Sequence, residues 1–200
     1  MRKFSKITGF FFGLLVFVLM STAAHAAPTD TYRVTKEEET YILTSDTGEE
    51  IARESAFGNV LSALDKRRAD GDGYRPCRLV FDGVTVTENA EFQNGTYELS
   101  GSVAFSGDGR LTVLRGGDVR LTGGTFSFTD GDGYIRVKDG TFTLSGATVT
   151  GGRRYAVMAD YAASARICIE SGRIHAASDY PAVYIAAGTL TVSGGTVENT

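Results

Sequence analysis

The chain has 200 residues, with 20 basic and 24 acidic side chains and a formal net charge of −4. That length is enough for one or two domains. Because the acidic excess is small and both signs are scattered, the composition argues against nucleic acid as a partner and against binding to an anionic membrane surface.

Residues 1–26 have the pattern of a secretory signal peptide. Basic residues stand at the start, an apolar run covers 9–20, and the segment ends in AHA, which fits a cleavage site. The apolar run is shorter than the roughly 20 residues of a spanning helix, although an uncleaved N-terminal anchor stays open as an alternative. We expect a secreted or cell-surface protein that begins near Ala27 and has no membrane span after cleavage.

Residues 27–76 are expected to form an N-terminal lead-in that includes a capping helix. Four apolar residues fall on one face at helical spacing: Phe57, Val60, Leu61 and Leu64. Gly71 supplies a stop signal, so the pattern predicts an amphipathic helix over about 53–69. A helix unrelated to capping is the alternative.

Four twelve-residue phrases in the second half of the chain align without gaps. They are DVRLTGGTFSFT (118–129), TFTLSGATVTGG (141–152), RICIESGRIHAA (166–177) and TLTVSGGTVENT (189–200). Apolar residues recur at the second, fourth and ninth places, and a shorter apolar-x-apolar pair precedes each phrase. Alternation with period two indicates strands rather than helices, and the small residues between them indicate corners.

A repeat of about 22–26 residues cannot bury its apolar residues alone and must stack on its neighbours. The sequence therefore predicts an all-β fold, a right-handed parallel β-helix (a β-solenoid) over 77–200 with about 22–26 residues per coil. Equivalent residues should form columns inside the tube. One column is expected to hold Phe126, Val149, Ile174 and Val197, and another Val119, Phe142, Ile167 and Leu190.

The last coil begins near residue 183 and stops without a capping pattern. Because an uncapped edge invites aggregation, we expect the β-helix to be incomplete at Thr200 and further C-terminal domains to follow.

The phrases at 140–150 and 188–197, together with 120–126, resemble repeats of bacterial surface adhesin-like β-helix proteins, which have the pectate-lyase-like right-handed architecture. The resemblance covers about 77–200 and carries only core and corner residues. It implies the fold, but it leaves open adhesins, polysaccharide lyases and glycoside hydrolases.

Cysteine, histidine and Asp-Gly motifs give little sign of catalysis. Cys77 should point inward and Cys168 outward several coils away, so we expect no disulfide between them. His175 is the one histidine after the leader, and a solvated position beside a corner explains it. The DGDG motifs at 70–73 and 130–133 are ordinary turn sequences, with a calcium site as the alternative. We expect no cofactor and no metal.

The coil around 153–182 carries extra residues and is the one region that mixes charges with aromatics. A lyase or hydrolase would need charged groups that converge there, and the candidates are Arg153, Arg154, Asp160, Arg166, Glu170, Arg173 and Asp179. A solvated face is the simpler interpretation. Aromatic rings with polar neighbours suit carbohydrate, so the candidate ligand-binding residues are Tyr155, Tyr161, Tyr180, Tyr184, Arg154 and Asp160.

The sequence thus favours an exported, non-catalytic scaffold or display stalk, with recognition of an extracellular glycan or a host or cell-surface protein by its loops. A carbohydrate-active β-helix enzyme is the alternative.

Overall fold

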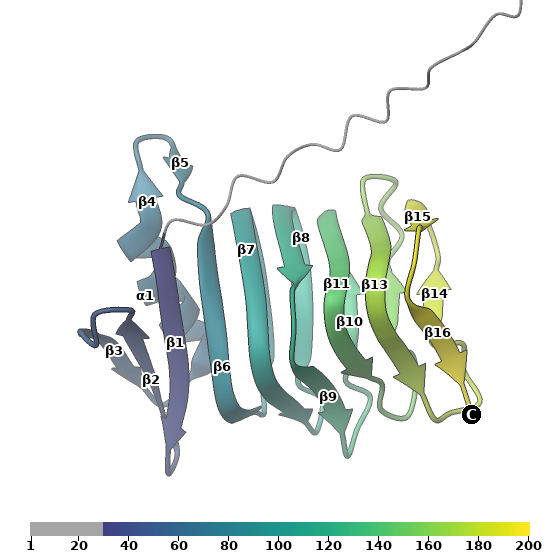
Figure 1. Ribbon diagram of the computed structural model, residues 1–200, viewed down its shortest axis with the longest axis horizontal. Coiled ribbons are helices and arrows are strands. Elements are labelled where there is room, and N and C mark those ends of the chain that lie inside the picture. Colours follow the sequence, from purple (N-terminus) through teal and green to yellow (C-terminus); the bar gives the residue numbers. More distant parts are fainter. Residues whose placement is uncertain (1–29) are drawn as a thin grey trace, which may run out of the picture.

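The computed structural model describes residues 30–200, so the expected signal peptide lies outside the described residues. The chain winds into a β-solenoid of about five turns, stacked along the long axis of the molecule (Figure 1). The N-terminal elements are β1 (Asp30–Glu37), β2 (Thr40–Ser45), β3 (Glu50–Glu54), α1 (Phe57–Arg68), β4 (Ala69–Asp70) and β5 (Gly73–Tyr74). The windings contain β6 (Cys77–Val86), β7 (Asn89–Ser106), β8 (Arg110–Leu121), β9 (Thr125–Thr129), β10 (Ile135–Val137), β11 (Gly140–Thr150), β12 (Val157–Ala159), β13 (Arg166–Ala176), β14 (Val183–Ile185), β15 (Thr189–Val192) and β16 (Thr196–Asn199).

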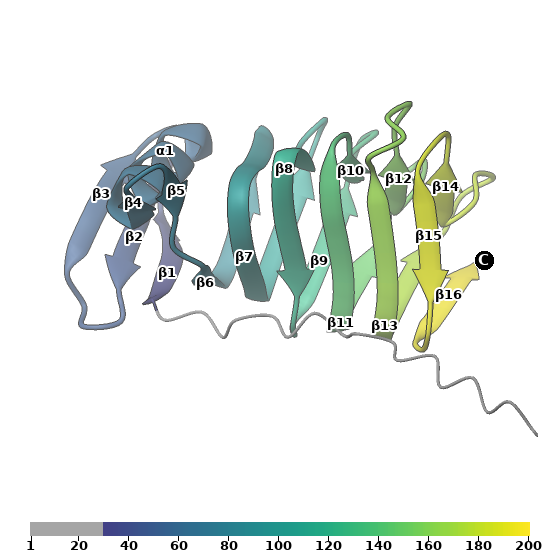
Figure 2. The same cartoon turned by 90° about the horizontal axis from the view of Figure 1, so that it is seen from above.

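Parallel pairing between successive windings produces three faces, because the long strands bend at their corners and contribute to two of them or, for β7, to all three. The first face contains β1, the first halves of β6, β11 and β13, the middle of β7, the end of β8, and β15. The second face contains the ends of β6, β7, β11 and β13 with β9 and β16. The third face contains the start of β7, the start of β8, and the short strands β10, β12 and β14. Figure 2 shows these faces around a common interior.

The register confirms the columns expected from the repeat. Val149 lies opposite Phe126 on one side and Ile174 on the other, and Val197 continues the column. The second expected column, from Val119 through Phe142 and Ile167 to Leu190, is also in register. A third column on the first face is formed by Leu79, Leu99, Leu121, Leu144, Ile169 and Val192. Like residues therefore stack above like, and apolar side chains fill the interior of the tube.

Glycine is required where the chain turns from the first face to the second. Gly124 has φ +85°, and a Cβ on it would lie 1.8 Å from the carbonyl oxygen of Gly101 in the previous winding. Gly101 has φ +87°, and its Cβ would lie 2.0 Å from the carbonyl oxygen of Phe81. Only glycine accepts both this backbone conformation and this close approach. The close stacking of successive windings therefore requires glycine at both positions.

The N-terminal end differs from the windings. β1 joins the first face by parallel pairing with β6, but β2 and β3 continue from it as an antiparallel meander that sequence reasoning missed. The expected helix is present, although it begins at Phe57 rather than near residue 53, because Glu50–Glu54 forms β3. Its apolar residues belong to the same core as the windings, and it lies with β2 and β3 at the N-terminal end (Figure 1). Within residues 30–200 no helix has the length and apolarity to cross a membrane.

Two polar contacts tie α1 to the first complete winding. Ala56, at the N-cap, offers no side-chain acceptor; a carboxylate oxygen of Glu88, between β6 and β7, accepts the N–H of Phe57 instead. At the other end Arg68 is fully buried and donates to Asp65 (3.0 Å) and to the carbonyl of Asn94 (3.0 Å). A buried cation is tolerated only when paired in this way.

Candidate functional site

Four tyrosines gather where the chain approaches or forms the short strands of the third face. We call them the tyrosine cluster: Tyr134, Tyr155, Tyr180 and Tyr184. Tyr134 directly precedes β10, Tyr155 and Tyr180 shortly precede β12 and β14, and Tyr184 lies within β14. Because β10, β12 and β14 pair in parallel register, consecutive windings bring these residues together.

Tyr155 is the centre of the cluster. Its ring stacks on that of Tyr184, with centroids 4.9 Å apart and 21° between the planes. It also makes edge contacts with Tyr180, at 5.4 Å and 73°, and with Tyr134, at 6.2 Å and 89°. Aromatic pairs of this kind contribute about 0.5–1.5 kcal/mol each beyond the area they bury. The rings therefore stabilise one another's positions.

Exposure increases across the cluster. Tyr134 is 8% exposed and Tyr180 is 43% exposed, while Tyr155 and Tyr184 are half-buried. The inner ring is buried, and the outer rings meet solvent. An aromatic surface with a solvent-exposed edge can stack against the apolar face of a sugar ring.

Polar groups border the cluster. The Arg154 guanidinium lies 5.9 Å from the centroid of Tyr180, and its Nε is 3.2 Å from a carboxylate oxygen of Asp132. The Ser178 hydroxyl donates to the carbonyl of Arg154 at 2.8 Å. On the inner side, the Arg110 guanidinium lies 5.0 Å over the ring of Tyr134. Hydrogen-bond donors and acceptors thus stand beside the exposed rings, as a sugar hydroxyl requires.

The structure separates two of the expected site residues from the others. Asp160 follows β12 on the side away from Tyr155, and it accepts hydrogen bonds from Arg136, with Arg136 Nε at 3.1 Å. Tyr161 comes next, is 81% exposed, and makes no ring contact within the described residues. The candidate set therefore divides into Tyr155, Tyr180, Tyr184 and Arg154, which meet, and Asp160 and Tyr161, which lie beyond β12.

Sequence reasoning missed Tyr134, Asp132 and Arg110. The signal for Tyr134 was its place before a strand. Tyr134 comes just before Ile135 in β10, as Tyr155 comes just before Val157 in β12, and Ile135 pairs with Val157. Asp132 stands in the DGDG motif at 130–133, for which the sequence predicts a turn, with a calcium site as the alternative.

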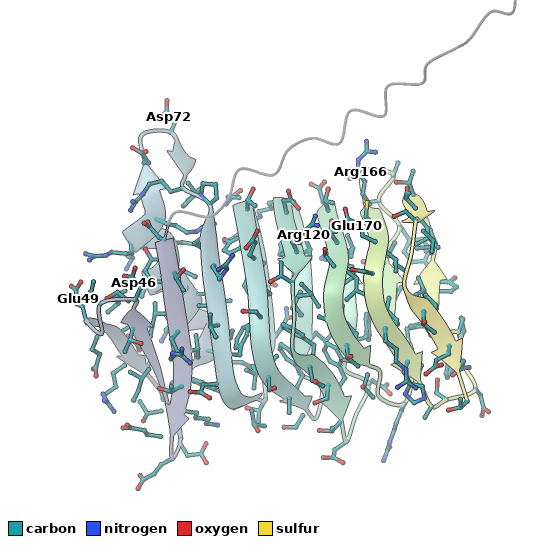
Figure 3. All side chains as sticks on the ribbon, viewed as in Figure 1. Asp46, Glu49, Asp72, Arg120, Arg166 and Glu170 are labelled. Atoms are coloured by element: carbon teal, nitrogen blue, oxygen red, sulfur yellow. The ribbon has the colours of Figure 1, made fainter. Side chains whose placement is uncertain are left out.

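Four charged side chains of the inserted coil form ion pairs with side chains of opposite charge. Asp160 pairs with Arg136, and Glu170 pairs with Arg120. Arg173 pairs with Glu198, and Arg154 pairs with Asp132. Arg120 also donates to Ser145 (2.8 Å), so its ion pair with Glu170 crosses the intervening winding on the outer surface of the first face (Figure 3). These carboxylates each meet a guanidinium rather than a second carboxylate, which is the arrangement of a solvated ion-pair surface.

Both cysteines are free, Cys77 in the core and Cys168 half-buried. They lie four windings apart, as the register of Cys77, Tyr97, Val119, Phe142 and Ile167 shows. Burial raises the pKa of the Cys77 thiol to about 12. Burial, and then the Glu170 carboxylate, also raise the pKa of Cys168. A raised pKa suppresses the thiolate, which is the nucleophilic form.

The remaining motifs have structural explanations. The DGDG at 70–73 forms the turn between β4 and β5, and the one at 130–133 lies in the bend before β10. No group of three or more candidate ligand side chains that could hold a metal occurs within residues 30–200. The half-buried His175 lies with its Nε2 3.0 Å from the Thr200 hydroxyl.

Comparison of the chain with protein-family models, curated proteins and solved structures finds no match.

Proposed function

We propose that the protein is an exported, non-catalytic β-solenoid that acts as an adhesin-like scaffold or display stalk and binds glycans through the tyrosine cluster. Export is inferred from the pattern of residues 1–26, and the adhesin-like role from the repeat phrases. The observation that carries the proposal is the interlocked set of rings around Tyr155, with Tyr180 43% exposed beside Arg154.

A scaffold role suits the stacked windings. Each winding pairs in parallel with the next, so the tube is held at every level by backbone hydrogen bonds and an apolar interior. We infer that α1 caps the N-terminal end, because its apolar face joins that interior and its ends are fixed by Glu88 and Asn94. A right-handed winding, expected for parallel crossovers, completes the proposal.

Glycan binding is tested on an array of bacterial and host glycans with the purified protein. We expect Tyr180→Ala and Tyr155→Ala to weaken binding at least about tenfold, or about 1.4 kcal/mol. Tyr161→Ala is the matched control, because it removes a far more exposed tyrosine that touches none of the cluster rings, and it should bind like the parent. An absence of signal on the array, or equal binding by all three variants, contradicts the proposed site.

The ion pairs of the inserted coil argue against the alternative of a carbohydrate-active enzyme. Cleavage of pectin or alginate by the purified protein, abolished by Arg154→Ala or Asp160→Ala, would replace the scaffold proposal with that alternative. Export has its own test: the N-terminal sequence of the secreted protein should begin near Ala27.

A further inference from the structure

Arg110 is a half-buried arginine at the start of β8 that has no counter-charge. Several other arginines of the windings pair with a carboxylate, as Arg78 does with Glu98 and Arg136 with Asp160. Within residues 30–200 the Arg110 guanidinium forms no ion pair, and its buried Nε has no hydrogen-bond acceptor. A guanidinium carries five N–H donors, and leaving a buried donor without an acceptor lowers stability. The fold therefore leaves the hydrogen-bonding capacity of this cation unused.

The ring of Tyr134 holds Arg110 beside the tyrosine cluster. The guanidinium lies 5.0 Å from the centroid of Tyr134, which is a cation–π contact. Tyr134 in turn lies 6.2 Å from Tyr155, the centre of the cluster. Only one ring separates the cation from Tyr155, so a sugar that contacts Tyr155 can extend a substituent toward Arg110.

These residues belong to windings that have a neighbour on both sides. β8 lies between β7 and β10, β10 lies between β8 and β12, and β12 lies between β10 and β14. Figure 2 shows the short strands β10, β12 and β14 side by side along the third face. The surroundings of Arg110, Tyr134 and Tyr155 are therefore set by described windings on either side.

The other charged groups that border the cluster compensate each other. Arg154 pairs with Asp132 at 3.2 Å, and Asp160, beyond β12, pairs with Arg136. Arg110 thus gives this part of the third face an uncompensated positive charge. A positive charge beside an aromatic surface favours an anionic ligand, and the planar guanidinium fork matches the two oxygens of a carboxylate.

We propose that the glycan bound by the tyrosine cluster is acidic, and that Arg110 binds the carboxylate of a uronic acid or sialic acid residue whose ring contacts Tyr155. This inference rests on the function proposed above and specifies its ligand. A neutral sugar can stack on the same rings, but it offers the Arg110 guanidinium no charged acceptor and therefore binds more weakly.

The test compares each acidic sugar with its own methyl ester, which keeps the sugar ring and removes the negative charge. The probes are an oligoglucuronate and sialyllactose, titrated into the purified full chain by calorimetry. We expect the parent to bind at least one of the two acids at least about tenfold more tightly than its ester, and we expect added salt to reduce the difference. The acid that shows the difference identifies the source of the carboxylate.

Arg110→Gln should abolish the preference for the acid while the affinity for the ester stays that of the parent. Arg110→Lys keeps the positive charge but loses the planar fork, so it should show an intermediate preference, and it serves as the test if Arg110→Gln does not fold. Arg115→Gln is the matched control, because Arg115 lies on the same strand, is exposed, and donates to Gln93 at 3.1 Å instead of contacting a cluster ring. It should keep the full preference.

The outcomes separate this inference from the proposed function. Equal binding of acid and ester by the parent, or an unchanged acid preference in Arg110→Gln or Arg110→Lys, would overturn the role of Arg110 and leave the glycan site in place. Binding of neither acid nor ester, together with an absence of signal on the glycan array, would overturn the proposed function and this inference with it.

Discussion

A carboxylate oxygen of Glu88 accepts the backbone N–H of Phe57, so the helix α1 is capped by a residue 31 positions away in the chain. The residue at the N-cap itself, Ala56, provides no side-chain acceptor. The contact thus joins the first turn of the helix to the bend between β6 and β7, and a negative charge at a helix N-terminus is favourable.

Glu88→Ala should lower the free energy of unfolding by about 0.5–2 kcal/mol, as loss of an N-cap acceptor does. Glu88→Gln keeps an acceptor oxygen and should lose less. Urea denaturation followed by circular dichroism measures both. Glu91→Ala is the control, because Glu91 is exposed and bonds to Asn89 rather than to the helix. Equal stability of Glu88→Ala and the parent would contradict a capping role for Glu88.

Gly124→Ala should be strongly destabilising, by more than about 3 kcal/mol, because it combines a strained backbone with a close contact. The added methyl group would lie 1.8 Å from the carbonyl oxygen of Gly101. Gly123→Ala is the neighbouring control, since a Cβ there meets nothing within 4 Å and φ is not positive. It should change stability by no more than about 1 kcal/mol. Similar melting temperatures for the two variants would show that the corner does not constrain Gly124.

Stability should fall at alkaline pH, in part because of Cys77. Burial raises the pKa of its thiol from 9.0 to about 12. Above about pH 9 the unfolded thiol ionises while the buried thiol keeps its proton, so the native state binds more protons and loses stability as pH rises. Between about pH 8 and pH 10 this contribution amounts to about 1.4 kcal/mol.

Cys77→Ala removes that contribution, so the variant should lose about 1.4 kcal/mol less than the parent over this interval. Urea denaturation at the two pH values measures the change in the free energy of unfolding for each protein. The stability lost by removing the sulfur is the same at both pH values, so it does not enter this comparison. Burial also raises the pKa of Tyr97. This lowers stability at alkaline pH in both proteins alike, so it does not affect the difference between them. An identical pH dependence would mean that Cys77 is not held protonated by the fold.

Much of the solenoid could be predicted because stacking imposes one rule on every winding. Ile167, for example, stacks between Phe142 and Leu190 inside the tube, so all three residues must be apolar. This rule produces a periodic pattern of apolar residues that can be recognised in the sequence. The meander of β2 and β3 obeys no such rule. It has no copy elsewhere in the chain with which it could be aligned, so its strands left no repeat signal.

The candidate site was predictable only in part for a related reason. Tyr155 and Tyr180 approach their strands alike, and the proximity expected from this is confirmed at 5.4 Å. The distance between Asp132 and Arg154 depends instead on how two irregular loops fold over each other. The ion pair of Arg120 with Glu170 depends on a register shift between β11 and β13 next to Ser145. Neither has a spacing that could be found in the sequence.

Every proposal made for this protein depends on an interior built from stacked, in-register columns, and one pair of substitutions tests that most directly. Val149 is fully buried between Phe126 and Ile174, whereas its neighbour Thr148 is half-exposed on the outer surface opposite Arg173. Val149→Asp should cost more than about 4 kcal/mol because it buries an unpaired charge, and Thr148→Asp should change stability by no more than about 0.5 kcal/mol. Thermal unfolding followed by circular dichroism should therefore show a folded Thr148→Asp protein and an unfolded or far less stable Val149→Asp protein; equal melting temperatures for the two would contradict the stacked interior.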